Sequence, residues 1–270
     1  MNDEAILNKK MKKRKNLLIS FGILGVVVVV IIGVILYMAY DDLKQEDLLK
    51  KEVVTLSNKK LDKDDFSINI VTKGDYVYVE EAIKNFYLKL SDSVKNISSV
   101  FDNQEFLQIL SANNITSDGP NFTKSLALID DTTKNVKEAM NSIIDLCNEE
   151  TVLNLLDKNK VDDYYIDFYK ELMLTDSDKD DLEATKKEMM NLSIDLEEFL
   201  NKAKEILLML KSNSNSWSIS DGQIYFTTDG LVNTYNNLYN ELTDKANKIQ
   251  KYNESVSDNN SSSSDKEIVA

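Results

Sequence analysis

The sequence predicts a mainly α-helical protein in which one N-terminal transmembrane helix precedes an extended antiparallel helical bundle with one or two short β-hairpins. Three observations support this fold class. Residues 17–40 carry no charge, long apolar stripes recur at helical spacing after residue 80, and period-two alternation is confined to two short segments. At 270 residues, the chain has room for one sizeable domain with accessory segments.

The uncharged segment at residues 17–40 is long enough to cross a membrane. As a helix its 24 residues span roughly 36 Å, compared with about 30 Å for the hydrocarbon core of a bilayer. Tyr37 and Tyr40 stand where an interfacial aromatic belt would lie. A cleaved signal peptide is the alternative, but its apolar core is shorter, about 7–15 residues, and Tyr37-Met38-Ala39-Tyr40 makes a poor cleavage site. We therefore expect an uncleaved signal anchor.

Charge sets the expected orientation of this anchor. Residues 1–40 carry six basic and two acidic side chains, a net charge of +4. The whole chain has a net charge of −14, so residues 41–270 have a net charge of −18. The positive-inside rule places residues 1–16 in the cytoplasm as a basic tail and everything after residue 40 outside the cell membrane. An acidic exterior repels nucleic acid and anionic lipid, so we expect no nucleic-acid partner. The lipid bilayer is expected to be contacted by residues 17–40.

The segment that follows the anchor is expected to form a stalk and then a short region of period two. Residues 41–65 are rich in charge with scattered leucines, and we interpret them as a helical or partly ordered stalk. In residues 66–79, apolar and polar side chains alternate around the turn sequence Thr72-Lys73-Gly74-Asp75. This pattern predicts a short hairpin, or alternatively that Tyr76 to Val79 lead straight into the next helix.

Helical spacing dominates from Glu80. A first long helix is predicted to reach Phe101, followed by a short piece at residues 102–110 and a loop at residues 113–120. A second long helix starts near Asn121, and a shorter pair covers residues 149–156 and 162–173. Two series in the second helix have a spacing of seven: Phe122, Ile129, Val136 and Ile143, and Leu126, Thr133, Met140 and Cys147.

The clearest pattern covers residues 180–210. Leu182, Met189, Leu196, Ala203 and Leu210 recur every seven residues, and so do Thr185, Leu192, Phe199 and Ile206. As a helix this segment is roughly 45 Å long and needs a partner surface. Other helices of the same chain can supply that surface, but a coiled-coil dimer would use the same residues.

The C-terminal part combines a hairpin, a helix and a polar tail. Asp221-Gly222 is a favoured two-residue type I′ turn, so residues 217–226 are predicted to form a β-hairpin. The last helix is expected at residues 230–252, capped by Asp229. Residues 253–270 are rich in Ser, Asp and Asn and are expected to be disordered. The extracytoplasmic helical domain is therefore assigned to residues 66–252.

Residues with catalytic or metal-binding patterns are missing from the sequence. There is no histidine, and the single cysteine, Cys147, falls in an apolar helical stripe. Residues 176–180 resemble the start of a calcium loop, but Asp181 and Lys187 occupy the positions where an EF-hand needs glycine and glutamate. We therefore expect no enzyme, no cofactor and no metal, and we rank a cell-wall hydrolase lowest among the possible functions.

Aromatic side chains provide the candidate contact residues. Tyr164 and Tyr165 lie in one cluster, and Trp217 and Tyr225 lie in the predicted hairpin; if exposed, they suit contact with a peptide or a glycan. Burial in the core is the competing interpretation. The leading functional hypothesis is a non-enzymatic, membrane-anchored interaction or structural protein of a bacterial cell surface, with an unknown protein partner and possible homo-oligomers. The alternative is a ligand-binding, sensor-like helical bundle that signals through a partner protein.

Overall fold

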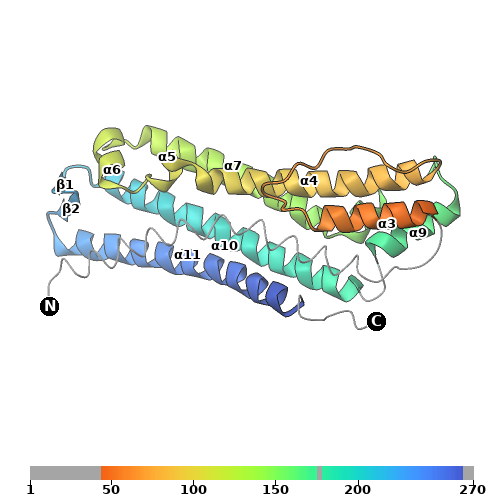
Figure 1. Ribbon diagram of the computed structural model, residues 1–270. Coiled ribbons are helices and arrows are strands. Elements are labelled where there is room, and N and C mark those ends of the chain that lie inside the picture. The colour runs from red at the N-terminus through yellow and green to blue at the C-terminus, as the bar shows by residue number, and fades with distance from the viewer. Residues whose placement is uncertain (1–43, 175–177, 264–270) are drawn as a thin grey trace. The chain divides into compact units, whose positions relative to one another are not determined.

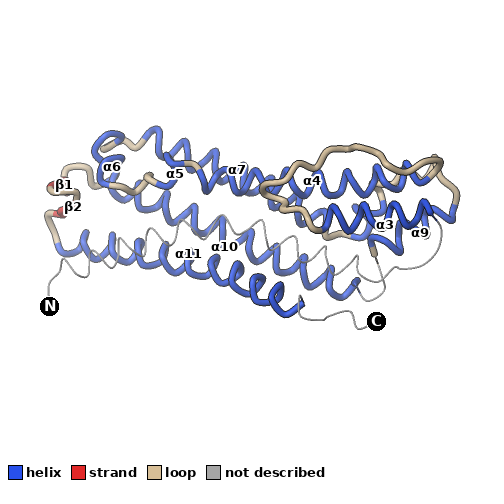
Figure 2. Tube along the Cα trace, viewed as in Figure 1, coloured by secondary structure: helices blue, strands red, loops and turns tan. Residues whose placement is uncertain are grey.

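The computed structural model describes residues 44–174 and 178–263 (Figure 1). These residues are mainly helical and contain one small two-stranded antiparallel sheet, which confirms the predicted mainly α class. Figure 2 shows how little of this part of the chain lies outside helices. The predicted cytoplasmic tail and the predicted membrane helix at residues 17–40 lie outside the described residues. Within the described ranges, no helix is both long enough and apolar enough to cross a bilayer.

The elements follow one another in a simple order along the chain. The helices are α3 (Lys44–Ser57), α4 (Tyr76–Asp102), α5 (Gln104–Leu107), α6 (Ala112–Asp118), α7 (Thr123–Leu146), α8 (Glu149–Leu153), α9 (Asp163–Met173), α10 (Asp178–Ser212) and α11 (Asp229–Ser263). The strands are β1 (Trp217–Ser220) and β2 (Gln223–Phe226), which pair between α10 and α11.

This part of the chain divides into two compact units, which are described separately below. The described residues of unit 1 are 97–138 and 192–252. Those of unit 2 are 44–96, 139–174, 178–191 and 253–263.

In unit 2, α3 belongs to the folded core. Leu49, Val53 and Leu56 recur on one face of the helix and are at most 3 % exposed, and Leu61 in the following loop is 1 % exposed. The sequence analysis treated the leucines of residues 41–65 as scattered along a stalk. Their spacing of four and three instead gives α3 an apolar stripe, which is buried once the helix packs in the unit.

The loop between α3 and α4 is held along α4 by polar contacts. It contains no strand, and α4 begins at Tyr76, so the second of the two alternatives for residues 66–79 is the one observed. Four α4 side chains bind loop residues: Ser91 and Lys95 donate to the carbonyls of Leu61 and Asp64, Lys84 donates to that of Asn69, and Glu80 accepts from Thr72. The backbone groups of the loop therefore bind side chains where a hairpin would have bound a second strand.

In unit 1, ion pairs define how α10 lies against its neighbours. Moving forward along α10 means moving backward along both α7 and α11, so α10 is antiparallel to each of them. The pairs with α11 are Asp195–Lys248 at 2.7 Å, Glu198–Lys245, and Lys202–Glu241 at 2.9 Å. The pairs with α7 are Glu197–Lys137 at 3.3 Å and Lys204–Asp130 at 2.6 Å.

The apolar stripe predicted for residues 180–210 is buried within a single copy of the chain. From Met189 to Leu210, every member of the two seven-residue series is at most 8 % exposed. Phe122, which directly precedes α7, and Ile129, Val136 and Ile143 within α7 are at most 2 % exposed. The helices of the chain itself therefore cover the stripe, which was the first of the two alternatives.

Three local predictions differ from the structure. Residues 113–120 were expected to be a loop but are largely α6, whose N-terminus is capped by the Ser111 hydroxyl, which accepts from the Asn114 amide at 3.2 Å. The first turn of α11 is capped by the Thr228 hydroxyl, not by Asp229. This helix also continues to Ser263, into the segment expected to be disordered.

The C-terminal hairpin is confirmed. Trp217 pairs with Phe226 and Ser220 with Gln223 across β1 and β2. Asp221 and Gly222 both have positive φ, 49° and 71°, as a type I′ turn requires. The right-handed twist of the two strands matches this turn, which explains why the Asp-Gly pair marks the hairpin so clearly in the sequence.

Candidate functional site

Tyr164 and Tyr165 belong to an aromatic cluster in unit 2. This tyrosine cluster consists of Tyr76 from the start of α4 and Tyr164, Tyr165 and Phe168 from α9. Tyr76 packs edge-on against Tyr165, with ring centroids 4.9 Å apart, and against Phe168 at 5.8 Å. Tyr164 packs edge-on against Tyr165 at 5.1 Å. Edge-to-face packing is the arrangement that the charge distribution of aromatic rings favours, so each ring restrains its neighbours.

A carboxylate from α3 accepts hydrogen bonds from the tyrosine cluster. Glu46 is 7 % exposed and accepts a hydrogen bond from the Tyr164 hydroxyl through Oε1. The Tyr76 hydroxyl reaches the same oxygen at 3.5 Å, and Lys50 lies 3.8 Å from the other one. The bond to Glu46 raises the pKa of Tyr164 well above its usual value, so the phenol stays protonated and acts as a donor.

The ring of Tyr164 remains accessible although its hydroxyl is bound. The residue is 51 % exposed, while Tyr165 beside it is half-buried. An aromatic side chain whose position is already restrained loses little conformational entropy when a partner covers it. The arrangement therefore suits a contact surface.

Trp217 anchors the hairpin of unit 1. Its indole N–H donates to the carbonyl of Leu210 at 2.7 Å, and its ring stacks on Phe122 with centroids 6.1 Å apart. The residue is half-buried. These contacts fix the base of the hairpin to the end of α10 and the start of α7, which is the packing role that the sequence analysis named as the alternative to an exposed contact.

Tyr225 is the exposed aromatic residue of the hairpin. It lies on β2 opposite Ser218 and is 49 % exposed, and its hydroxyl approaches Gln223 Oε1 at 3.5 Å. The four predicted contact residues thus fall into two places. Tyr164 and Tyr165 share a cluster in unit 2, and Trp217 and Tyr225 share the hairpin of unit 1.

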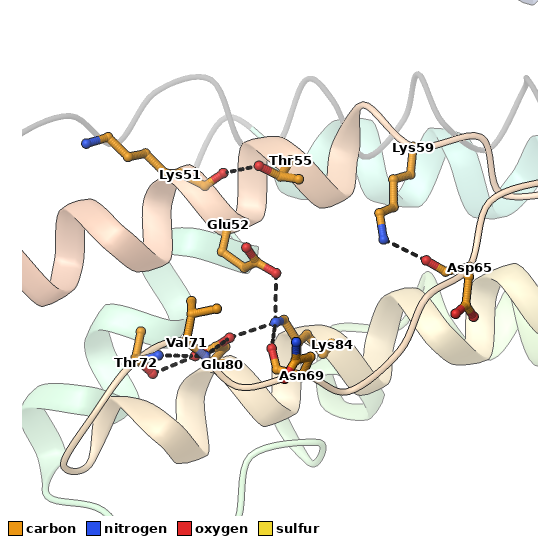
Figure 3. A network of polar contacts seen from close by, with 10 residues as sticks. All are labelled: Lys51, Glu52, Thr55, Lys59, Asp65, Asn69, Val71, Thr72, Glu80 and Lys84. Carbon is orange, nitrogen blue, oxygen red and sulfur yellow. Dashed lines mark hydrogen bonds and ion pairs between the residues drawn. The ribbon is translucent and has the colours of Figure 1, made fainter.

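The sequence analysis missed a buried charged network in unit 2 (Figure 3). Glu80 is fully buried and accepts from the Val71 amide at 2.9 Å and from the Thr72 amide at 2.8 Å and hydroxyl at 2.6 Å. Lys84 is 3 % exposed, and its ammonium lies 2.7 Å from both Glu80 and Glu52. Burial alone would raise the pKa of Glu80, but the hydrogen bonds from Lys84, Thr72 and Val71 outweigh burial and hold that pKa below its usual value.

This network has a structural role. The Glu80 and Lys84 side chains are satisfied by partners within the chain, so neither is available to a substrate. The network connects α3, α4 and the loop between them, because each of the three contributes at least one residue to it. The only sequence signal for it is the spacing of four between Glu80 and Lys84, which is common on exposed helix faces as well.

A polar groove of about 740 Å³ lies in unit 1. Its lining is mostly amide and hydroxyl side chains: Gln104, Glu105, Gln108, Ile109, Ser111, Asn113, Asn114, Ser117, Asp118, Lys124, Ser125 and Leu128. Asp118 caps α7 there, accepting from the Ser125 amide at 2.7 Å and the Lys124 amide at 3.2 Å. These bonds, with that of the Ser125 hydroxyl, outweigh the effect of burial and lower the pKa of Asp118.

Residues 44–174 and 178–263 contain no group of three acidic or cysteine side chains placed to hold a metal ion. The calcium-like segment at residues 176–180 lies largely outside the described residues. Burial raises the pKa of Cys147 to about 11, so this thiol stays protonated at neutral pH.

Comparison with known proteins gives no family for this chain. No protein-family model matches the sequence, and no curated protein or solved structure is similar to it.

Proposed function

We propose that the chain is a membrane-anchored, extracytoplasmic interaction or structural protein of a bacterial cell surface, without catalytic activity, and that the tyrosine cluster is its contact with a protein partner. The observation that carries the contact is the state of Tyr164, whose ring is 51 % exposed while its hydroxyl is bound to the buried carboxylate of Glu46. Restrained, partly exposed aromatic residues are typical of the few side chains that dominate the affinity of an interface.

The membrane location in this proposal comes from the sequence. Residues 17–40 have the length and the lack of charge of a spanning helix, and the basic residues before them orient it with the N-terminus in the cytoplasm. The finer fold proposed for the exterior part is an extended antiparallel bundle. The antiparallel ion pairs of α10 with α7 and α11 support this arrangement within unit 1.

The rest of the described chain is consistent with a role in contact rather than in catalysis. Its buried charges, Glu80 and Lys84, bind each other and the loop. Its thiol is buried and protonated at neutral pH. Glu80, Lys84 and Cys147 are thus used in holding the fold, whereas a catalytic site would leave such groups accessible to a substrate.

Site-specific crosslinking tests the contact. A photo-crosslinking amino acid replaces Tyr165 in the full-length chain in its native membrane, and a matched control carries it at Glu183, an exposed position of unit 2 whose side chain is 75 % accessible. We expect a discrete crosslinked product from position 165 only. When Tyr164→Ala is added to the chain that carries the probe at position 165, we expect the yield of the crosslinked product to fall about tenfold. Hot-spot residues typically contribute more than about 1.4 kcal/mol to binding, which corresponds to a factor of ten in affinity.

Two outcomes would contradict this assignment. Equal crosslinking from both positions would show that the probe reports random collisions. An undiminished product in the Tyr164→Ala variant would show that the exposed ring contributes nothing to the contact.

The sensor-like alternative has less support. It would be favoured by a pocket lined by Tyr164, Tyr165 or Trp217, and the polar groove of unit 1 is lined by none of them.

A further inference from the structure

The hairpin of unit 1 differs in composition from the rest of the chain. Of the seventeen residues 212–228, only Asp221 is charged, whereas 29 % of all residues in the protein are charged. The segment also contains no proline, and its strands are rich in aromatic and β-branched residues. Exposed strand edges are usually protected from pairing by short strand length, charged side chains, proline or bulges. The two strands here are short, four residues each, but they carry no charged side chain, proline or bulge.

The hydrogen-bond pattern shows which backbone groups are left at the edge. The Thr227 amide donates to the Ser216 carbonyl at 2.9 Å, which sets the phase of the ladder. Because hydrogen-bonded pairs alternate in an antiparallel sheet, Ser218–Tyr225 is the next such pair. On β2, the N–H and C=O groups of Ile224 and Phe226 therefore point away from β1, and none of them has a hydrogen-bond partner among the residues that the structure describes.

We propose that the free edge of β2 pairs with the same edge of a second copy of this chain, forming a four-stranded sheet in the order β1–β2–β2–β1. An antiparallel pair centred on Tyr225 places Ile224 of one copy opposite Phe226 of the other, twice. Each of these two pairs exchanges two hydrogen bonds, so all four outward N–H groups of the two strands are satisfied. No other register of these four-residue strands uses all of them.

Side chains and charge support a second copy as the occupant. The two Tyr225 residues face each other as a non-hydrogen-bonded pair with Cα atoms about 4.5 Å apart, and cross-strand aromatic pairs stabilise sheets. The chain carries a net charge of −14, so two copies repel each other over most of their surface. The uncharged hairpin is a place where they can approach. The antiparallel arrangement keeps the two Asp221 carboxylates at opposite ends of the new pair, and each then stands at the end where α11 of the other copy begins with Asp229.

This inference is independent of the proposed contact at the tyrosine cluster. The hairpin belongs to unit 1 and the cluster to unit 2, so the failure of one proposal leaves the other in place. Pairing through β2 also requires no particular membrane orientation, since it depends only on two copies meeting.

Cysteine crosslinking of the full-length chain tests the geometry. In a Cys147→Ala background, Tyr225→Cys is compared with Ser218→Cys, its neighbour across the hairpin. In the proposed sheet the two 225 positions face each other, whereas the two 218 positions are three strand spacings apart, about 14 Å, beyond the roughly 7 Å limit for a disulfide. On mild oxidation we expect Tyr225→Cys to become a covalent dimer in large part and Ser218→Cys to stay monomeric.

A proline variant tests the backbone hydrogen bonds. Ile224→Pro removes an outward N–H without removing a bond inside the hairpin, and Ile219→Pro does the same on the edge of β1. In the Tyr225→Cys background, Ile224→Pro is expected to abolish the covalent dimer and Ile219→Pro to preserve it. The fluorescence of Trp217, the only tryptophan, reports whether the hairpin base stays packed in each variant.

Several results would overturn the inference. The first is that Tyr225→Cys forms no covalent dimer in the chain without proline. The second is that Ser218→Cys forms as much dimer as Tyr225→Cys, and the third is that the Tyr225→Cys dimer persists when Ile224→Pro is added. Loss of the dimer in Ile219→Pro with unchanged tryptophan fluorescence would assign the pairing to β1 and would overturn it as well.

Discussion

At the scale of single residues, the most consequential group is the buried network of Glu52, Glu80 and Lys84. Lys84→Met keeps much of the aliphatic volume of the side chain but leaves the fully buried Glu80 carboxylate without its ammonium partner. Removing one partner of a buried ion pair typically costs about 3–5 kcal/mol. We therefore expect Lys84→Met to lower the free energy of unfolding by about 3 kcal/mol, measured by urea denaturation.

A matched control for this variant is Lys134→Met. Lys134 also has a glutamate four residues away, Glu138, but both side chains are about 70 % exposed. Exposed pairs contribute about 0–1 kcal/mol. If both variants cost the same, the network contributes no more than a surface ion pair and its structural role is wrong.

The same network predicts how stability changes with pH. The pKa of Glu80 is lower in the folded protein than its usual value of 4.5, so the unfolded chain binds the proton more readily. The stabilisation by Glu80 is therefore fully present above about pH 5 and is lost as the pH falls through the folded pKa. In urea unfolding series between about pH 7 and pH 3, Glu80→Gln is expected to flatten this acid dependence.

The pKa of Asp118 is lowered too, so Glu80→Gln is expected to remove only part of the acid dependence. A double variant with Asp118→Asn should remove more. An acid dependence of unchanged steepness in Glu80→Gln would contradict the assigned role of this carboxylate.

At the scale of elements, the hairpin base depends on close packing at Gly119, the residue that ends α6. A Cβ atom on Gly119 would overlap the carbonyl of Ile115 and would lie 3.2 Å from Trp217 and 3.3 Å from Phe122. We expect Gly119→Ala to destabilise the protein by about 1–3 kcal/mol, because overpacking forces neighbouring groups to shift. The Trp217 emission should shift to longer wavelength as its ring becomes more exposed.

Gly230→Ala is the control for this substitution. Gly230 lies in the first turn of α11 and its Cβ would meet only the Thr228 hydroxyl at 4.0 Å. Alanine favours a helix there, so stability should be unchanged or raised by up to about 1 kcal/mol. Equal destabilisation by both variants would show that Gly119 has no special packing role.

The elements also show which patterns the sequence can predict. The α10 stripe and the Asp-Gly hairpin were predicted because helical burial and type I′ turns leave local, periodic signals. The network of Glu80 was missed because its partners in the loop and in α3 depend on tertiary packing. Tyr164 and Glu46 are 118 residues apart, so no local pattern connects the carboxylate to the tyrosines it holds. The helix α6 was missed because an Asn- and Ser-rich segment resembles a loop until Ser111 is recognised as a cap.

At the scale of the whole molecule, the chain consists of a proposed membrane anchor at residues 17–40 and two compact units in the described residues. The proposed contact with a protein partner lies in unit 2 and depends on the acidic part of the chain being outside the cell, whereas pairing through β2 in unit 1 does not. The orientation of the chain in the membrane is therefore the central claim of the proposed function.

Cysteine labelling in intact cells tests that claim most directly. In a Cys147→Ala background, Asn215→Cys places a thiol at an exposed site before the hairpin, and Asn8→Cys places one in the predicted cytoplasmic tail. With a membrane-impermeant maleimide, we predict labelling of Asn215→Cys in intact cells and of Asn8→Cys only after permeabilisation. Labelling of Asn8→Cys from outside, or of Asn215→Cys only after permeabilisation, would contradict the account.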